Sequence, residues 1–401
     1  MTFGTGQDPV GPTAAGAPRL YGTAHMTESD QRLFIARGEL DQARLGPDPD
    51  APAQRALAPG QVRLAVERFA LTANNITYAA FGEAMKYWQF FPAGDAALGC
   101  LPVWGFATVQ ESHAEGVTAG QRVWGYFPAG THLVVAPTRV SAAGFVDGSP
   151  HRQELAGVYN QYLFCAADPA WQPALEGLQA VLRPLFLTAF LLDDHLADHA
   201  FFGARQLLLS SASSKTALGT AHCLAQRRHQ PGCPRIVGLT SAANAGFVRS
   251  LGCYDEVLTY EEWSARVAPI PTAYIDFAGD AELRRRVHTQ FADALMFSSS
   301  IGGTHWEALG SGRDLPGPRP TLFFAPAQAK ARSAPPPEGW GSAELQRRMG
   351  QAWMQFIDQV RQGDWVQTVE QHGAQAALQA YGRLLAGEVP AREALLLDMR
   401  G

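Results

Sequence analysis

Two patterns of apolar residues divide the chain. Between residues 61 and 140, short apolar segments alternate with turns rich in Gly and Pro, which is typical of strands in a compact β-domain with barrel character. These segments are QVRLAVERFAL (61–71), VWGFATVQES (103–112), GQRVWGYFP (120–128) and HLVVAPTRV (132–140). Residues 40–60 are rich in Pro and Asp, and we expect a loop there.

The second pattern begins near residue 181, where wholly apolar segments alternate with helical ones. It predicts strands at 206–211, 235–241, 256–260, 273–279, 294–302 and 321–327. It predicts helices at 184–203, 215–229 and 244–252, the last ending on a C-cap glycine at Gly252. This alternation indicates a parallel, doubly wound sheet of the Rossmann type. The end of the chain predicts a helix, a short extended segment and a helix.

Composition narrows the class of protein. A chain of 401 residues with 46% hydrophobic and 17% charged residues is typical of a soluble globular protein with a large core. A net charge of −5 argues against a nucleic-acid or anionic-membrane partner. The five cysteines form no C-x-x-C pair, residues 1–24 lack an apolar signal region, and the apolar stretch at 185–192 is too short to cross a bilayer. We expect a cytoplasmic protein.

The segment LLLSSASSKTALGTAHCLA (207–225) has the strand–turn–helix form of a dinucleotide-binding motif. Ala212, Ser214 and Ala217 stand where that motif carries glycines, and their small side chains preserve much of the close approach to a pyrophosphate. Lys215 places a cation at a helix N-terminus, which is unfavourable unless a phosphate lies nearby. The candidate cofactor residues of the turn are Ser210, Ser211, Ser213, Ser214, Lys215 and Thr216. The alternative is a packing turn in a domain that binds no nucleotide.

The second strand of this unit favours NADP over NAD. It ends at Thr240 and Ser241, where an acidic residue would bind the adenosine ribose of NAD. No acidic residue is present, so a 2′-phosphate would meet no repulsion. Ser241 and Lys215 are the nearest candidates to bind it, with Arg249 a weaker one. Ser298 and Ser299, at the end of a later strand, are candidates for the nicotinamide side of the cofactor.

Several stretches resemble the medium-chain dehydrogenase/reductase superfamily, in particular its zinc-free quinone-oxidoreductase and enoyl-reductase branches. They are GQVRLAVERFALTANNITYAAFG (60–82), VWGFATVQESHAEGVTAGQRVWGYFPAGTHLVV (103–135), PLFLTAF (184–190), VGLTSAANAGFVRSLGCYDEVLTYEE (237–262), GDWVQTV (363–369) and QAALQAYGRLLAGE (375–388). The turn SSASSKTA (210–217) is similar to that of an uncharacterised branch of the superfamily.

This resemblance implies an α/β chain with a GroES-like β-barrel domain and a Rossmann-type domain. The expected divisions are a flexible lead-in (1–25), a GroES-like catalytic domain (26–180), a dinucleotide-binding domain (181–325) and a C-terminal segment returning to the catalytic domain (326–401). The resemblance also places Thr188 beside the nicotinamide and implies a homodimer joined through the sheets of the cofactor domains. The stretches that hold the zinc ligands of related alcohol dehydrogenases contain none here, so we expect no metal.

The loop region ANNITYAAFGEAMKYWQFFP (73–92) flanks the nicotinamide on this interpretation. Asn74, Asn75 and Tyr78 are then candidate catalytic groups that polarise a substrate carbonyl, with Tyr78 a candidate proton donor. Candidate residues of the substrate pocket are Tyr87, Trp88, Phe90, Arg152 and Tyr159. The alternatives are an aromatic core for the ring residues and a surface salt bridge for Arg152. His195 and His199 have the i, i+4 spacing of a metal pair, but a polar exposed face is the expected explanation.

The sequence therefore predicts a zinc-independent, NADPH-dependent oxidoreductase that reduces a carbonyl or an activated C=C bond of a small, partly apolar substrate. The alternative is a non-redox lyase, an isomerase or a ligand-binding protein on the same fold, which the serines of the turn favour. An interaction or scaffold protein is the third hypothesis, and only the C-terminal tail supports it.

Overall fold

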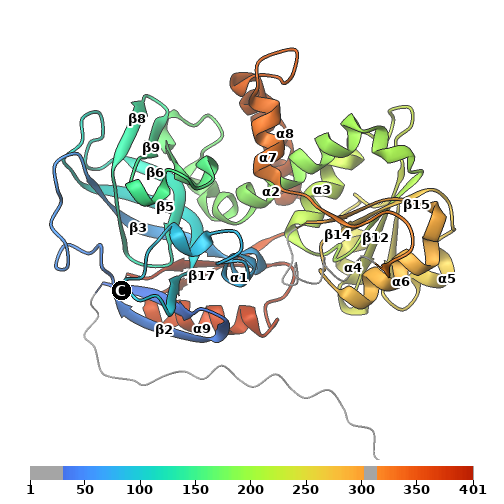
Figure 1. Cartoon of the computed structure of the whole chain (residues 1–401), viewed down its shortest axis with the longest axis horizontal. Helices are drawn as coiled ribbons and strands as arrows, with labels where there is room; N and C mark the ends of the chain where they lie inside the picture. The colour runs from blue at the N-terminus through green and yellow to red at the C-terminus, as the bar shows by residue number, and fades with distance from the viewer. Residues whose placement is uncertain (1–29, 302–313, 401) are drawn as a thin grey trace, which may run out of the picture.

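The computed structural model describes residues 30–301 and 314–400, which form two domains on either side of a central seam (Figure 1). The lead-in expected at residues 1–25 lies outside the described residues. Short 3-10 helices connect the larger elements at Tyr87–Gln89, Pro150–Arg152, Gly157–Asn160, Cys165–Ala167, Pro173–Leu175, Ala200–Gly203 and Ala292–Ala294.

The first domain is built on a nine-stranded, mostly antiparallel sheet in the described part of the chain. Its order is β17-β18-β3-β5-β6-β10-β9-β8, and β7 also pairs with β3. The strands from the first half of the chain are β3 (Val62–Leu71), β5 (Pro102–Ser112), β6 (Arg122–Pro128), β7 (His132–Val135), β8 (Pro137–Ser141), β9 (Gly144–Asp147) and β10 (Gln161–Phe164). A smaller sheet joins β1 (Gln31–Ala36), β2 (Glu39–Pro47) and β4 (Leu98–Cys100) in the order β2-β1-β4. The short helix α1 (Ala73–Ala80) follows β3 directly.

The second domain is a parallel sheet with the order β13-β12-β11-β14-β15-β16. Its strands are β11 (Gln206–Leu209), β12 (Arg235–Thr240), β13 (Glu256–Thr259), β14 (Thr272–Asp276), β15 (Leu295–Ser300) and β16 (Thr321–Leu322). The order reverses between β11 and β14, and in such sheets ligands bind at that reversal, beyond the carboxyl ends of the strands.

Helices cover both faces of the parallel sheet, which is why its strands are almost continuously apolar. Leu207 and Leu209 face one core together with α2 (Glu176–Asp198), α3 (Lys215–Ala225) and α4 (Ala242–Ser250). Leu208 faces the other, which contains residues of α5 (Trp263–Arg266) and α6 (Ala281–Phe291). The alternation of these three leucines therefore fixes which helices lie on which side.

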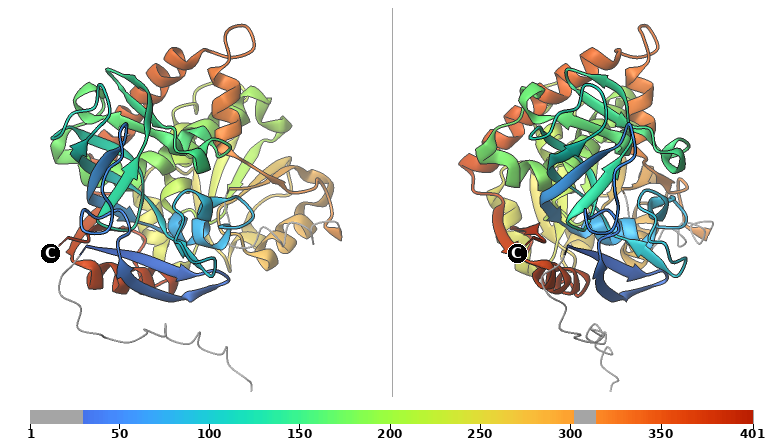
Figure 2. Two further views of the ribbon diagram at one scale, coloured as in Figure 1. Left: turned by 60° about the vertical axis from the view of Figure 1, so that its left-hand side comes forward. Right: turned by 90° about the vertical axis from the view of Figure 1, so that its left-hand side faces the viewer.

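Three elements bring the two domains together. Helix α2 packs on α3 of the second domain and on β3 and β5 of the first. A hairpin of α7 (Ala325–Ser333) and α8 (Ser342–Gln362) stands over the seam (Figures 1 and 2). The chain then returns to the first domain through β17 (Gln367–His372), α9 (Ala374–Leu385) and β18 (Glu393–Asp398), which pairs with β3.

Helix α2 is unusually long and apolar. Among the described residues, Pro173–Asp198 is the single helical segment long and apolar enough to span a membrane. However, 67% of its apolar window is buried inside the protein. It contacts both domains along its length, as a core helix does.

Two expectations about the elements were wrong, and one strand was missed. The loop expected at 40–60 contains β2, an edge strand whose side chains are exposed or half-buried apart from Ala43 and give no apolar pattern. The strand expected at 321–327 is only Thr321–Leu322, because Pro326 stands in the first turn of α7 and favours a helix start. The last strand, β18, was not predicted, although its buried leucines Leu395, Leu396 and Leu397 give a clear signal.

Candidate active site

The turn between β11 and α3 adopts the bend of a nucleotide-binding loop without its glycines. Ser211 has a φ of 47°, the left-handed conformation that glycine adopts most easily. Ser214 is the N-cap of α3, and its hydroxyl accepts a hydrogen bond of 3.4 Å from the Ala217 N–H. The sequence therefore forms the expected strand–turn–helix unit.

The serine hydroxyls of this turn mostly serve the turn itself. Ser210 donates to the Asp276 carboxylate over 2.9 Å and accepts the N–H groups of Phe277 and Ala278. Ser213 accepts a hydrogen bond from the side-chain amide of Asn244 at 3.2 Å. Ser210 therefore donates its proton within the protein, whereas the Ser213 and Ser214 hydroxyls are acceptors in these hydrogen bonds and keep their own protons.

Two tyrosines on either side of β13 contact the turn. The Tyr260 hydroxyl accepts the Ser211 N–H at 3.0 Å, and the Tyr254 hydroxyl donates to the Ala212 carbonyl at 3.0 Å. Burial raises the pKa of both phenols, so both hydroxyls stay protonated at neutral pH.

The Lys215 side chain is directed to the C-terminal segment that returns to the first domain. Its ammonium donates to the carbonyls of Ala391 and Glu393, at 3.1 and 2.7 Å, in the segment leading into β18. Burial lowers the pKa of Lys215 to about 8, and the nearby Glu393 acts in the opposite direction. These two hydrogen bonds explain the cation at the start of α3 as a tether between the domains, and a phosphate contact of Lys215 stays an untested prediction.

Two hydroxyls at the carboxyl edge of the parallel sheet have no partner. The Oγ1 of Thr240, at the end of β12, and the Oγ of Ser300, at the end of β15, are buried and form no hydrogen bond with the described residues. Ser241 occupies the N-cap position of α4, but its side chain does not cap the helix. Unpartnered buried hydroxyls are costly, so these positions are where a polar ligand or water would be stabilising.

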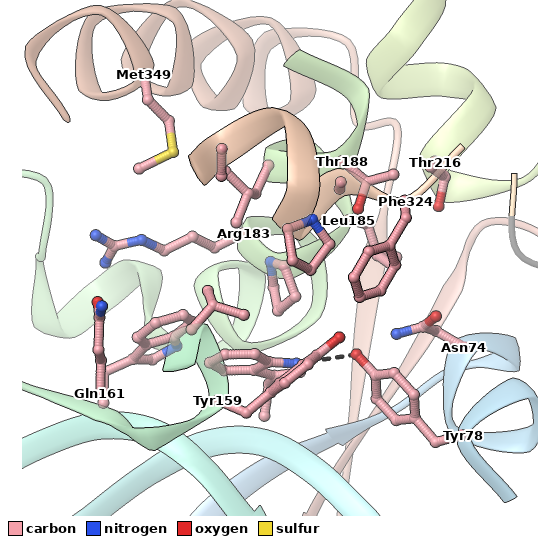
Figure 3. Close-up of a pocket in the computed structure, with 18 of the residues that line it drawn as sticks. Asn74, Tyr78, Tyr159, Gln161, Arg183, Leu185, Thr188, Thr216, Phe324 and Met349 are labelled. Carbon is pink, nitrogen blue, oxygen red and sulfur yellow. Dashed lines mark hydrogen bonds between the residues drawn. The ribbon is translucent and has the colours of Figure 1, made fainter. Parts of the chain in front are cut away.

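A cavity of about 630 Å³ lies between the two domains. Its wall contains side chains from α1, β5, β6, α2, the start of α3, the end of β15 and the α7–α8 hairpin. Asn74, Tyr78, Thr188, Thr216 and Phe324 lie at one end, and Gln161, Arg183 and Met349 lie at the other (Figure 3). The cavity is of the size that accepts drug-sized ligands.

Helix α1 determines which of the predicted catalytic residues reach this cavity. Thr72 and Asn75 form a capping box at its start, and the Asn75 amide also donates to the Pro102 carbonyl at 2.8 Å. Asn75 is thereby committed to holding the helix on β5. Asn74 and Tyr78, one helical turn apart, line the cavity instead.

Tyr78 has an aromatic and strongly desolvated environment. The indole Nε1 of Trp104 donates a hydrogen bond to its hydroxyl oxygen at 3.1 Å. Burial raises the pKa of Tyr78, and hydrogen bonds from its neighbours only partly oppose this. The phenol is therefore protonated at neutral pH, and its own proton can be donated to an acceptor in the cavity.

Tyr87 and Tyr159 also line the cavity, whereas three other predicted pocket residues do not. Trp88 is enclosed between the backbones of Gly82 and Gly99, where no Cβ would fit. Phe90 is buried in the core of the β-domain. Arg152 is 1% exposed and pairs with Asp147 at 3.2 Å, so it forms a buried ion pair rather than a substrate contact or a surface bridge.

The residues predicted to contact the cofactor near the cavity also fall into two groups, those that line the cavity and those that do not. Thr188 and Thr216 line the cavity. Ser298 and Ser299 do not, because Ser298 bonds the His288 ring at 2.9 Å and Ser299 bonds the Thr321 carbonyl at 3.3 Å. Ile301 is the residue of this strand end that reaches the cavity.

Several lining residues were missed from the sequence. They are Trp104, Trp124, Arg183, Phe324, Gln346 and Met349. The two tryptophans looked like ordinary strand residues, and only pairing of β5 with β6 brings Trp104 next to Trp124. The contribution of α7 and α8 gave no local signal, because those helices reach the site only through tertiary packing.

No group of three His, Cys, Asp or Glu side chains suited to a metal ion occurs among residues 30–301 and 314–400. The His195 and His199 rings lie against each other, with centroids 4.4 Å apart, and His199 also stacks on Phe202. Burial lowers the pKa of His195. This pair therefore forms part of an aromatic cluster.

Comparison with solved structures defines the class of fold. CurA from Vibrio vulnificus in complex with NADPH is 14% identical, covering 92% of this chain and 99% of that chain, with a TM-score of 0.56. YhdH from E. coli K-12 with bound NADPH is 14% identical over 92% and 100%, with a TM-score of 0.50. A mutant enoyl thioester reductase from Candida tropicalis is 11% identical over 92% and 99%, with a TM-score of 0.51. The predicted fold, a GroES-like domain with a Rossmann-type domain, is confirmed.

The family follows from the sequence itself. Residues 69–390 match the family described as "Protein of unknown function (DUF2855)", and the chain belongs to that family. No curated protein matches the sequence significantly.

Proposed function

We propose that this protein is an NADPH-dependent oxidoreductase that reduces a carbonyl or an activated C=C bond without a zinc ion. The observation that carries the proposal is the shared cavity. It joins Thr216, in the first turn of α3, and Ile301, at the end of β15, to Asn74 and Tyr78 of the other domain. A nicotinamide bound at the carboxyl edge of the sheet would therefore face a buried phenol across the seam.

The residues present fit a bound NADPH, although fewer side chains are free than the sequence suggested. The first turn of α3 offers an N-terminal helix end to the pyrophosphate, beside Thr216. The adenosine ribose and its 2′-phosphate would contact the Thr240 hydroxyl, which has no partner, and Ser241, whose side chain makes no capping hydrogen bond. Thr188 would lie against the nicotinamide. Two proteins that share the fold, CurA and YhdH, were crystallised with NADPH.

The chemistry divides between cofactor and protein. NADPH, when bound, supplies a hydride to the electrophilic carbon of the substrate. The Tyr78 hydroxyl donates a hydrogen bond to the substrate oxygen and then transfers its proton, which solvent replaces. Trp104 holds the Tyr78 oxygen through its indole N–H and stabilises the phenolate during that transfer. The Asn74 amide is a second donor for the substrate oxygen.

The side chains of the cavity wall support a reaction without zinc, because they do not include a set of zinc ligands in the described residues. The cavity wall contains Asp168 as its carboxylate, paired with Arg183, and neither Cys nor His lies with it in the described wall. Proton transfer is therefore assigned to the phenol of Tyr78.

The second candidate is a non-redox lyase, an isomerase or a ligand-binding protein. It is favoured by the protein groups that occupy positions expected for cofactor contacts. The Ser211 N–H is taken by Tyr260, and the Lys215 ammonium is taken by backbone carbonyls. Such a protein would use the same cavity and would show no dependence on NADPH.

We also propose a cytoplasmic homodimer. All five cysteines are free thiols, as expected in a reducing compartment. Strand β16 is the last strand of its sheet in the described part of the chain, and the side chains of Thr321 on β16 and Met296 on the neighbouring β15 are exposed. A second copy pairing at this edge would cover them. Light scattering after size-exclusion chromatography would give the mass of a single chain if this is wrong.

The function is tested by titrating the protein with NADPH and following nucleotide fluorescence. Thr216→Glu places a carboxylate at the pyrophosphate position, while an acidic residue in a first helical turn is favourable for the helix. The wild type is expected to bind NADPH more tightly than NADH, and the variant is expected to lose NADPH binding. Gln375→Glu, at the same position of α9, is the matched control and should bind normally. No response of the wild type to millimolar NADPH would exclude the proposed function.

A further inference from the structure

Resting on the proposed function, we propose a substrate class for the cavity. The substrate is an uncharged molecule with a flat aromatic body. Its reducible group lies at Tyr78, and its body extends along the cavity toward α8. This inference rests on the aromatic walls of the cavity, on the pairing of its charges and on its extent.

The cavity wall contains several aromatic rings close to Tyr78. Trp104 and Trp124 are stacked, with centroids 4.7 Å apart and planes inclined by 20°. Tyr159 lies 5.9 Å from Trp104 on the same wall, and Phe324 lines the cavity from the other domain. Trp124 already has Trp104 and Arg183 against its ring, so Tyr159 and Phe324 would contact the ligand. These rings favour a planar aromatic ligand, which gains from ring contacts as well as from burial.

The charges in the described wall are already neutralised. Arg183 pairs with Asp168 and lies over the Trp124 ring, 4.8 Å from its centroid. Arg347 pairs with Glu344 at 2.7 Å. A carboxylate or phosphate of the substrate, in the part of the cavity between Tyr78 and α8, would lose its hydration and find no free cation among the described lining residues. The substrate is therefore uncharged in the part that enters.

The cavity is longer than a small ketone requires. Tyr78 and Thr216 lie at one end and Gln161 and Met349 at the other (Figure 3), in a volume of about 630 Å³. Gly350 of α8 lines the wall, and a Cβ at this glycine would meet no atom within 4 Å. A side chain added at Gly350 would therefore project into open space in or beside the cavity without disturbing the packing of α8.

The first experiment measures binding without cofactor. Quenching of tryptophan fluorescence is followed with chalcone, 4-carboxychalcone and 3-buten-2-one as probes. Chalcone is expected to bind about tenfold more tightly than either of the other two, since one lacks the aromatic body and the other carries a charge. Equal affinities for chalcone and 4-carboxychalcone would overturn the inference.

The second experiment tests where the body of the substrate lies. Gly350→Phe is expected to lower the ratio of kcat/KM for chalcone to that for 3-buten-2-one about tenfold, measured as NADPH oxidation. Gly246→Phe is the matched control, because Gly246 is an exposed helical glycine of α4 that also has open space around it. An unchanged ratio in a folded Gly350→Phe protein would overturn the inference.

The two proposals fail in different ways. Selective binding of chalcone without NADPH oxidation on any ketone would contradict the reductase and would support the ligand class of the cavity. NADPH oxidation with equal use of all three probes would support the reductase and would contradict the substrate class.

Discussion

The indole N–H of Trp104 donates a hydrogen bond of 3.1 Å to the hydroxyl oxygen of Tyr78. The two residues come from β5 and α1, and the pairing of β5 with β6 places the Trp124 ring against the Trp104 ring. The phenol is thus fixed in position and kept protonated by burial, and the hydrogen bond from Trp104 leaves its own proton available to another acceptor.

This hydrogen bond predicts that substitutions of Tyr78 and Trp104 lower kcat by different factors. Tyr78→Phe removes the proton donor and is expected to lower kcat at least about 100-fold. Trp104→Phe keeps an aromatic ring but removes one donor to the developing phenolate, so we expect a smaller loss of about tenfold in kcat. Steady-state NADPH oxidation measures both. A Tyr78→Phe enzyme with unchanged kcat would show that another group, or water, supplies the proton.

Lys215 is predicted to stabilise the protein rather than bind the cofactor. Its ammonium joins α3 to the carbonyls of Ala391 and Glu393. Lys215→Met is therefore expected to lower the free energy of unfolding by about 1–3 kcal/mol, with NADPH affinity little changed. Urea unfolding and NADPH titration measure the two effects. The exposed Lys330 provides the control substitution Lys330→Met, and a selective loss of NADPH affinity in Lys215→Met would contradict the tether.

His222 is predicted to make stability depend on pH. It is buried against Phe356, and burial lowers its pKa to about 4 from an ordinary value of 6.5. Between these values the unfolded chain binds a proton that the folded protein does not bind, so stability is lost as pH falls from 6.5 toward 4. The slope from this residue is about 1.4 kcal/mol per pH unit.

The check is urea unfolding between pH 7 and 4.5. His222→Gln should remove this part of the slope. His113→Gln is the control, since His113 is 44% exposed and should leave the slope as it is. Equal slopes in the wild type and His222→Gln would show that His222 does not carry the effect.

Arg152 is predicted to act in the core of the first domain. It pairs with Asp147, and its side chain also donates to the Tyr162 hydroxyl at 3.1 Å and the Phe90 carbonyl at 3.2 Å. Arg152→Met leaves Asp147 buried without its counter-ion, so the free energy of unfolding should fall by about 3–5 kcal/mol. An Arg152→Met protein of unchanged stability but raised KM would contradict this role and would indicate that Arg152 contacts the substrate.

The fold was predictable because its signals are local and repeated. The continuous apolar strands around Leu207–Leu209 and the capped helices between them indicate a parallel sheet without any tertiary information. The edge strand β2 was missed because only Ala43 among its residues is fully buried, and its composition is that of a loop. The short β16 was overestimated because a single Pro converts the apolar segment after it into α7.

The candidate site was predictable only where a single helix or strand determines which way the side chains point. Tyr78 and Asn74 share a helix face, so the sequence places both in the cavity. Asn75, next to them, is turned into the capping box, which the spacing from Thr72 indicates in hindsight. Lys215 and Arg152 could not be assigned, because their partners lie 176 and 5 residues away and depend on how the chain returns.

The central claim is that NADPH lies across the seam with its nicotinamide facing Tyr78. A crystal structure of the protein with NADPH tests it most directly. We expect the pyrophosphate at the first turn of α3 beside Thr216, and the nicotinamide between Thr188 and Tyr78. A structure grown at saturating NADPH in which Tyr260 and Tyr254 still close the turn, and which shows no nucleotide in the seam, would contradict the account.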